Sequence, residues 1–146
     1  MDNNRFELEK EVLRKKLPSN FYRFDDIGTD KACLSAAART NNDKLYTMKI
    51  ELKDFPEKPP RVFVTEELMD NDGMALQCCH EMHCYGTEDG RTQLCHYPDG
   101  AWTPRVSLYK VYIKCRLWLE LYEIYKETGK TIDQLITEIN KQDGNN

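Results

Sequence analysis

The residue best placed for chemistry is Cys95, one of six cysteines in the chain. It belongs to the stretch Arg91-Thr-Gln-Leu-Cys-His-Tyr-Pro-Asp-Gly-Ala-Trp-Thr-Pro104, in which a short run that can end a strand leads into a turn, a tryptophan and a proline. A thiolate on irregular backbone between a strand and a helix is a common setting for a nucleophile. Asp99 in this stretch can orient an incoming amine, but we expect it to serve as an ordinary turn residue. Cys95 is therefore a candidate nucleophile, and evidence from the rest of the chain is needed to distinguish it from the other five cysteines.

A second group of nitrogen and sulfur side chains precedes this stretch and allows a different chemistry. Its members are Cys78, Cys79, His80, His83 and Cys84. They are numerous enough to supply the four ligands of a tetrahedral zinc ion. The spacing is not a standard CxxC pair and no second CxxC follows, so zinc remains the alternative. The favoured interpretation has free thiols and no metal or other cofactor.

Composition limits the class of protein. A length of 146 residues fits one domain, residues 1–146, and the net charge of −4 lacks the basic balance that nucleic-acid binding normally requires. No apolar run approaches the ~20 residues that cross a bilayer, and the first five residues do not resemble a signal peptide. We therefore expect a cytoplasmic protein without a membrane or nucleic-acid partner, whose cysteines are reduced thiols.

The elements that must position Cys95 follow an α+β plan. Asn4 and Glu7 resemble a capping box for a first helix that Pro18 ends. Alternation and turn signals predict a four-stranded antiparallel meander at residues 21–27, 32–38, 45–52 and 61–65. Residues 66–94 show no lasting period and are expected to form a functional loop. A long helix over residues 106–128, with Gly129 as its C-cap, should pack on the sheet, and a short helix over residues 131–141 follows, with Ile132, Leu135, Ile136 and Ile139 facing inward.

Basic residues cluster on the first helix of this otherwise acidic chain. Arg5, Lys10 and Arg14 lie on its polar faces. A solvated helix face would carry the same residues, so the pattern alone leaves two interpretations open. The alternative to a solvated face is a docking surface for an acidic protein partner.

Two motifs resemble the ubiquitin-conjugating (UBC) enzyme family. The stretch Tyr46-Thr-Met-Lys-Ile-Glu-Leu-Lys-Asp-Phe-Pro-Glu-Lys-Pro-Pro-Arg-Val-Phe-Val64 is similar to that family's third and fourth strands with the Pro-x-x-Pro-Pro bend between them. Leu94-Cys95 and Trp102-Thr-Pro104 match its Leu/Ile-Cys and Trp-Ser/Thr-Pro landmarks in order and spacing. The resemblance covers most of the chain. It implies a UBC-like fold and a cysteine that carries an acyl group as a thioester.

The details are most similar to the compact prokaryotic members of this family. The eukaryotic His-Pro-Asn is missing, whereas His83-x-Tyr85-Gly86, Gly90 and Leu94-Cys95 follow the prokaryotic pattern. Such proteins occur in bacterial ubiquitin-like operons and in antiphage (CBASS) operons, where the conjugating protein joins the C-terminus of a cGAS-like cyclase and primes it. The resemblance thus implies a partner with a C-terminal glycine, either such a cyclase or a ubiquitin-like protein. An activating enzyme is a further possible partner.

Other residues are candidates for supporting roles. His83 and His96 are general-base candidates because imidazole titrates near neutral pH. His83 also occupies the position of the family's loop-bracing histidine, which is the role we favour. His96 directly follows Cys95 and can raise the positive potential at the thiol. Trp102 should form a wall beside Cys95 and is grouped with the basic residues as a partner-binding candidate. Without the family's Asn, the donor for the oxyanion is unassigned among backbone N–H groups, Thr92, Gln93 and Tyr85. Two rival functions remain: a non-catalytic UBC-like binding module, and a zinc-stabilised interaction domain.

Overall fold

The computed structural model describes residues 1–98 and 100–144, so the turn predicted at Asp99 lies outside the described residues. Its elements are α1 (Asn3–Lys16), the 3-10 helix η1 (Ser19–Phe21), β1 (Tyr22–Asp25), β2 (Cys33–Arg39), β3 (Leu45–Glu51), β4 (Val62–Val64), the 3-10 helix η2 (His80–Met82), β5 (Cys84–Glu88), β6 (Arg91–Leu94), α2 (Leu108–Thr128) and α3 (Ile132–Gly144). The order of helices and strands confirms the predicted α+β plan.

One antiparallel sheet contains six strands in the order β1-β2-β3-β4-β6-β5. The predicted four-stranded meander forms β1 to β4. A hairpin, β5–β6, extends it because β6 pairs with β4, with Val62 opposite Leu94. The expectation of an unstructured loop over residues 66–94 was therefore wrong for its last eleven residues. The hairpin carries the chain to Cys95 on a paired strand.

The β5–β6 hairpin has a turn and a bulge that the sequence encodes. Asp89 and Gly90 both have positive φ, 53° and 77°. Two-residue turns of this kind match the twist of a hairpin, and Asp-Gly is a strong signal for them. The register shifts between Cys84 and Gly86, so Tyr85 is the extra residue of a bulge and is left exposed. Bulges of this kind re-aim side chains next to functional sites.

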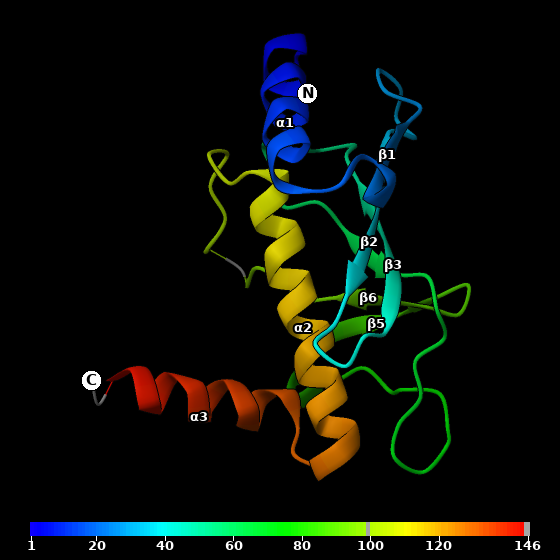
Figure 1. Cartoon of the computed structure of the whole chain (residues 1–146), viewed down its shortest axis with the longest axis vertical. Coiled ribbons are helices and arrows are strands. Elements are labelled where there is room, and N and C mark those ends of the chain that lie inside the picture. The colour runs from blue at the N-terminus through cyan, green and yellow to red at the C-terminus, as the bar shows by residue number, and fades with distance from the viewer. Residues whose placement is uncertain (99, 145–146) are drawn as a thin grey trace.

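The core lies between the sheet and α2. Along β3 the predicted alternation is present, because Tyr46, Met48 and Ile50 are buried. Figure 1 shows α2 running alongside the sheet, α1 beyond one end of α2, and α3 leaving the other end. The Tyr112 hydroxyl on α2 donates to the Ala37 carbonyl on β2 at 2.9 Å. The long helix packs on the sheet as predicted.

The termini of the helices follow local signals. Asp2 caps α1, because its carboxylate accepts a hydrogen bond from the Arg5 N–H at 2.8 Å; the capping box predicted at Asn4 was therefore wrong. Gly129, in the left-handed region at φ 77°, ends α2 as expected. On α3, Ile132 and Leu135 are buried and Ile136 is partly buried. Ile139 was predicted to face inward but is 40% exposed, because this half of α3 extends beyond the core.

A buried carboxylate ties α1 to the start of α2. Glu9 is 3% exposed and accepts a hydrogen bond from the Leu108 N–H at 2.9 Å. Arg5 bonds to Glu9 at 2.9 Å and donates to the Pro104 and Val106 carbonyls at 2.5 and 2.8 Å. The Arg5 guanidinium also lies 4.9 Å from the centre of the Phe55 ring. Arg5 is thus engaged within the fold, and the prediction that it docks a partner does not fit this position.

Replacing Glu9 with Ala should destabilise the protein. The Leu108 N–H would lose its acceptor at a buried position and Arg5 its carboxylate, so we expect the free energy of unfolding to fall by about 2 kcal/mol. Chemical denaturation measures this change. Glu11→Ala on the same helix is the control, because Glu11 only pairs with exposed Arg14 and Lys15. An equal loss in both variants would contradict a special role for Glu9.

Candidate active site around Cys95

Cys95 is the first residue after β6 and is partly exposed with a free thiol. The other free cysteines differ from it in their surroundings. Cys33 and Cys115 are buried, and burial raises the pKa of both thiols. This confirms that they serve as small apolar side chains. Cys79 is exposed and lies outside the strands, next to η2.

The backbone of Cys95 is fixed by the residue before β5. Its N–H donates to the His83 carbonyl at 3.0 Å. The same carbonyl accepts from the Trp118 indole N–H at 3.1 Å, and this N–H also lies 3.0 Å from the Met82 carbonyl. His83 itself adopts the left-handed conformation, with φ of 50°. We call His83, Trp118 and Asp133 the brace of Cys95.

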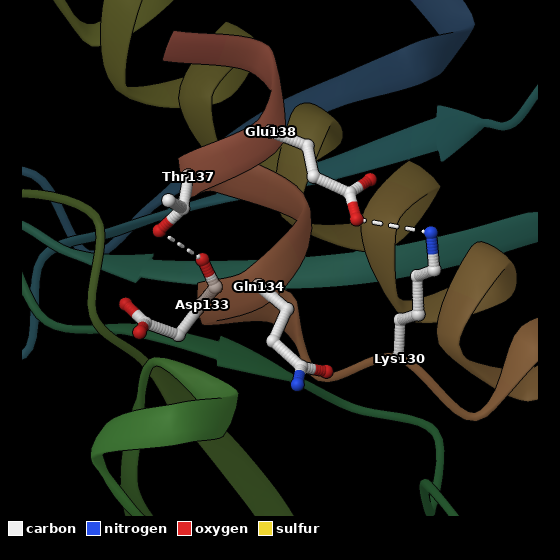
Figure 2. Close-up of a pocket in the computed structure, with 5 residues that line it drawn as sticks. All are labelled: Lys130, Asp133, Gln134, Thr137 and Glu138. Carbon is white, nitrogen blue, oxygen red and sulfur yellow. Dashed lines mark hydrogen bonds and ion pairs between the residues drawn. The ribbon is translucent and has the colours of Figure 1, made fainter. Parts of the chain in front are cut away.

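Asp133 connects this brace to α3. Its carboxylate lies 2.9 Å from His83 Nε2, and this hydrogen bond is the main cause that lowers the pKa of Asp133. Figure 2 shows the Asp133 carboxylate turned away from the ion pair between Lys130 and Glu138. The hollow beside these residues, about 290 Å³ in volume, is lined by residues of α3 and by Lys130 in the link from α2, and not by Cys95. The His83 side chain is thus bonded to α3, and its loop-bracing role stays a prediction.

The segment after Cys95 is held by aromatic contacts. The Trp102 indole N–H donates to the Pro56 carbonyl at 2.8 Å, and its ring meets those of Phe55 and Tyr97 edge-on at 6.1 and 5.2 Å. The Lys114 ammonium on α2 lies 3.9 Å from the centre of the Tyr97 ring. Trp102 therefore joins this segment to the proline-rich bend, which accounts for the spacing of the two motifs.

His96 is partly buried, and its two ring nitrogens lie in the buried part of the side chain. Both ring nitrogens are shielded from solvent and lack a partner among the residues described. Burial is the main cause that lowers the pKa of His96 to about 4. The charge of Lys114 lowers this pKa further, whereas the Leu94 backbone raises it by a smaller amount. The ring is therefore neutral near pH 7. The predicted electrostatic role, which needs a positive imidazole beside the thiol, does not fit this environment.

The candidates for the oxyanion donor differ in exposure. Thr92 is 1% exposed on the core side of β6, so its hydroxyl is not available to a substrate. The Cys95 N–H is already used by the His83 carbonyl. Gln93 is partly exposed and Tyr85 is 58% exposed at the bulge. The side chains of Gln93 and Tyr85, and the other backbone N–H groups of the segment, remain candidates for the oxyanion donor.

A family model describing the type II CBASS E2 protein matches residues 9–132. This match covers most of the chain and includes β1 to β6, Cys95 and α2. The chain belongs to the type II CBASS E2 family. No curated protein and no solved structure gives a significant match.

Membership in the type II CBASS E2 family places the chain among bacterial ubiquitin-conjugating-like proteins. It indicates a role in antiphage defence and interaction with other CBASS proteins. No helix in the described part of the chain is long and apolar enough to cross a membrane. The resemblance found from the two sequence motifs is thereby confirmed at the level of the family.

One expectation for the cysteines of this CBASS E2 family member was wrong. Cys78 and Cys84 are joined by a disulfide, with their Cα atoms 5.0 Å apart, although all six were expected to be reduced. The predicted zinc ligands are not gathered either: over residues 1–98 and 100–144, no three His, Cys, Asp or Glu side chains are placed to hold a metal ion. The fold brings Cys84 back to Cys78 through η2, which residue spacing did not reveal.

The remaining basic residues of α1 stay on the surface of the CBASS E2 protein. Lys10 pairs with Glu7 at 3.3 Å and Arg14 with Glu11 at 2.6 Å. Both side chains are substantially exposed, and their acidic neighbours lie on the same helix. Unlike Arg5, they are free to face a partner. Docking by Lys10 and Arg14 therefore stays a prediction.

Replacing Trp118 with Phe tests the brace in this CBASS E2 protein. The ring would still stack on Tyr122, but the indole donor to residues 82 and 83 would be lost. We expect the free energy of unfolding to fall by about 1 kcal/mol and the Cys95 amide to exchange its hydrogen faster. Trp102→Phe is the matched control, because it loses one indole hydrogen bond elsewhere. Equal acceleration at Cys95 in both variants would refute the brace.

Proposed function

We propose that the protein is a cysteine acyl carrier that links the C-terminal glycine of a partner protein to Cys95 and passes it on. The observation that carries this proposal is the position of Cys95: a free, partly exposed thiol directly after β6, on backbone that His83 and α2 hold in place. Membership in a ubiquitin-conjugating-like family supports the same assignment.

The proposed reaction has two steps. The Cys95 thiolate attacks the carbonyl carbon of an activated C-terminal glycine, either an acyl-adenylate or an existing thioester. The carbon–sulfur bond forms as the previous leaving group departs, and the thiol proton passes to solvent or to that group. An amine then attacks the new thioester, an amide forms, and Cys95 is released as a thiol. Cysteine suits this role because its thioester forms readily and still reacts with amines.

The surrounding residues have different parts in this proposal. The brace keeps the Cys95 backbone in one orientation, so the thiol meets the acyl group without first ordering the loop. Gln93, Tyr85 or a backbone N–H supplies the donor for the oxyanion of the tetrahedral intermediate. His96, neutral at pH 7 and with both ring nitrogens shielded from solvent, is assigned only a supporting role.

For the partner we favour a cGAS-like cyclase over a ubiquitin-like protein. The family match is to CBASS systems, which the resemblance associates with priming of such a cyclase through its C-terminus. Lys10 and Arg14 are the candidate contacts for an activating enzyme or for the partner itself. Trp102 is assigned to the fold rather than to partner binding, since its indole N–H bonds to the Pro56 carbonyl and its ring contacts those of Phe55 and Tyr97.

Coexpression with the neighbouring CBASS gene products tests the proposal. Intact mass spectrometry should find an adduct whose mass is the sum of the two chains minus one water. Neutral hydroxylamine should release the partner, as expected for a thioester. A partner lacking its last residue serves as the control and should give no adduct. Absence of any hydroxylamine-sensitive adduct, in the presence of the cyclase and any encoded activating enzyme, would overturn the carrier assignment and favour a binding module.

A further inference from the structure

We propose that Cys78 and Cys84 form a reversible dithiol–disulfide site, which takes low-molecular-weight disulfides as its oxidant and controls how firmly Cys95 is held. Neither cysteine has a part in the acyl-carrier reaction. They are joined in this structure, and the bond closes a short loop around η2 and His83. The proposal concerns the protein's response to thiol redox conditions and goes beyond acyl transfer.

The position of the disulfide connects it to the brace. The enclosed segment ends with His83, whose carbonyl accepts the Cys95 N–H. Cys84 is the first residue of β5 and lies opposite Leu94, the residue before Cys95. The disulfide therefore links Cys78 to β5, the strand that pairs with β6 directly before Cys95.

The segment has a conformation that benefits from such a constraint. His83 is a non-glycine residue with φ of 50°, in the sparsely populated left-handed region. Such conformations persist where the surroundings hold them. In the oxidised state the disulfide fixes both ends of the segment. After reduction, the segment keeps hydrogen bonds such as those from Trp118 and to Asp133 and the packing of buried Met82, but loses its covalent link.

The two thiols differ in access, which sets the order of the exchange reaction. Cys78 is partly exposed and Cys84 is 6% exposed. The Cys78 thiolate attacks one sulfur of the oxidant, forms a mixed disulfide and releases one thiol of low molecular weight. The Cys84 thiolate then attacks the Cys78 sulfur and releases the second. The two protons lost by the protein thiols end on the two released thiols, and excess thiol reverses both steps.

Cys79 provides a matched control because it adjoins the pair without belonging to it. Its thiol is exposed and free. Cys79→Ser should leave the redox response intact, whereas Cys78→Ser should abolish it. All three cysteines lie between Arg61 and Arg91, with no other Lys or Arg in that range, so one tryptic peptide reports on them together. In the oxidised chain this peptide should carry one alkylated cysteine, and in the reduced chain three.

The experiment equilibrates the full-length protein in defined ratios of reduced and oxidised glutathione. Alkylation and mass spectrometry then give the state of the peptide, and hydrogen exchange of the Cys95 amide reports on the brace. We expect exchange to be on the order of tenfold faster in the reduced protein. Cys78→Ser should show the fast rate under both conditions, and Cys79→Ser should follow the unaltered chain.

Two results would overturn the proposal. One is a peptide that stays fully alkylated at every glutathione ratio, which would mean that the disulfide does not form by this exchange. The other is a Cys95 exchange rate that does not change with the oxidation state of the pair. Both measurements use the isolated chain, so their outcome does not depend on whether an adduct forms with a partner.

Discussion

Cys95→Ala is expected to abolish the hydroxylamine-sensitive adduct completely, whichever CBASS partner is supplied. Alanine has no nucleophile, and the other free thiols cannot replace Cys95: two are buried with raised pKa values, and Cys79 lies outside the braced strand end. Removal of the side chain leaves the hydrogen bond from the backbone N–H of residue 95 to His83 in place. The fold should therefore survive while the chemistry is lost.

Two further variants sharpen this prediction. Cys79→Ala should form the adduct at the normal level, because that thiol is exposed but not positioned by the sheet. Cys95→Ser places a hydroxyl at the same site, so any adduct should be an oxyester that resists neutral hydroxylamine. Intact mass spectrometry with and without hydroxylamine distinguishes the three. Persistence of the labile adduct in Cys95→Ala would show that another residue is the acyl carrier.

Stability is expected to fall by about 3 kcal/mol between pH 7 and pH 4 on account of His96 alone. Burial lowers its pKa from 6.5 to about 4 in the folded chain. Between these values the unfolded chain binds a proton that the folded chain does not, so acidification favours unfolding. The contribution of neutral His96 to stability is therefore fully present above about pH 6.5 and is lost progressively as the pH falls toward 4.

His96→Phe isolates this effect from the titration of the many carboxylates. Neither ring nitrogen has a partner among the described residues, so an apolar ring of similar shape forfeits no hydrogen bond there. Urea denaturation of both proteins over this pH range should give a difference that grows by about 3 kcal/mol toward pH 4. His80→Gln is the control, because His80 is an exposed side chain. Parallel pH profiles for the His96 variant and the unaltered chain would contradict the buried, neutral imidazole.

Local signals were sufficient for much of the fold. The alternation in β3, the proline after α1 and the glycine after α2 act over a few residues, and each appears where it was predicted. The β5–β6 hairpin was missed although Asp89-Gly90 was a usable signal, because its strands are too short to show a period. The real cap Asp2 lies two residues before the predicted one, a scale on which capping patterns are ambiguous.

The candidate site was less accessible to prediction from sequence. Cys95 followed from motifs, but its support comes from Trp118 and Asp133, which are distant along the chain and occur in segments that sequence assigns to helix packing. Arg5 looked like a surface residue because the carbonyls of Pro104 and Val106 that it contacts cannot be inferred from side-chain types. The Cys78–Cys84 pair likewise depends on a return of the chain that no spacing rule encodes.

Four contacts of the chain between Cys95 and Val106 use main-chain acceptors, namely the carbonyls of His83, Pro56, Pro104 and Val106. Every amino acid has a carbonyl, so the acceptors at Pro104 and Val106 do not depend on the side chain, whereas His83 also bonds Asp133 through its ring. The identities that matter are those of the donors, above all Trp118, Trp102 and Arg5. A substitution of one of these donors therefore removes a hydrogen bond that a side-chain change at Pro104 or Val106 would leave in place.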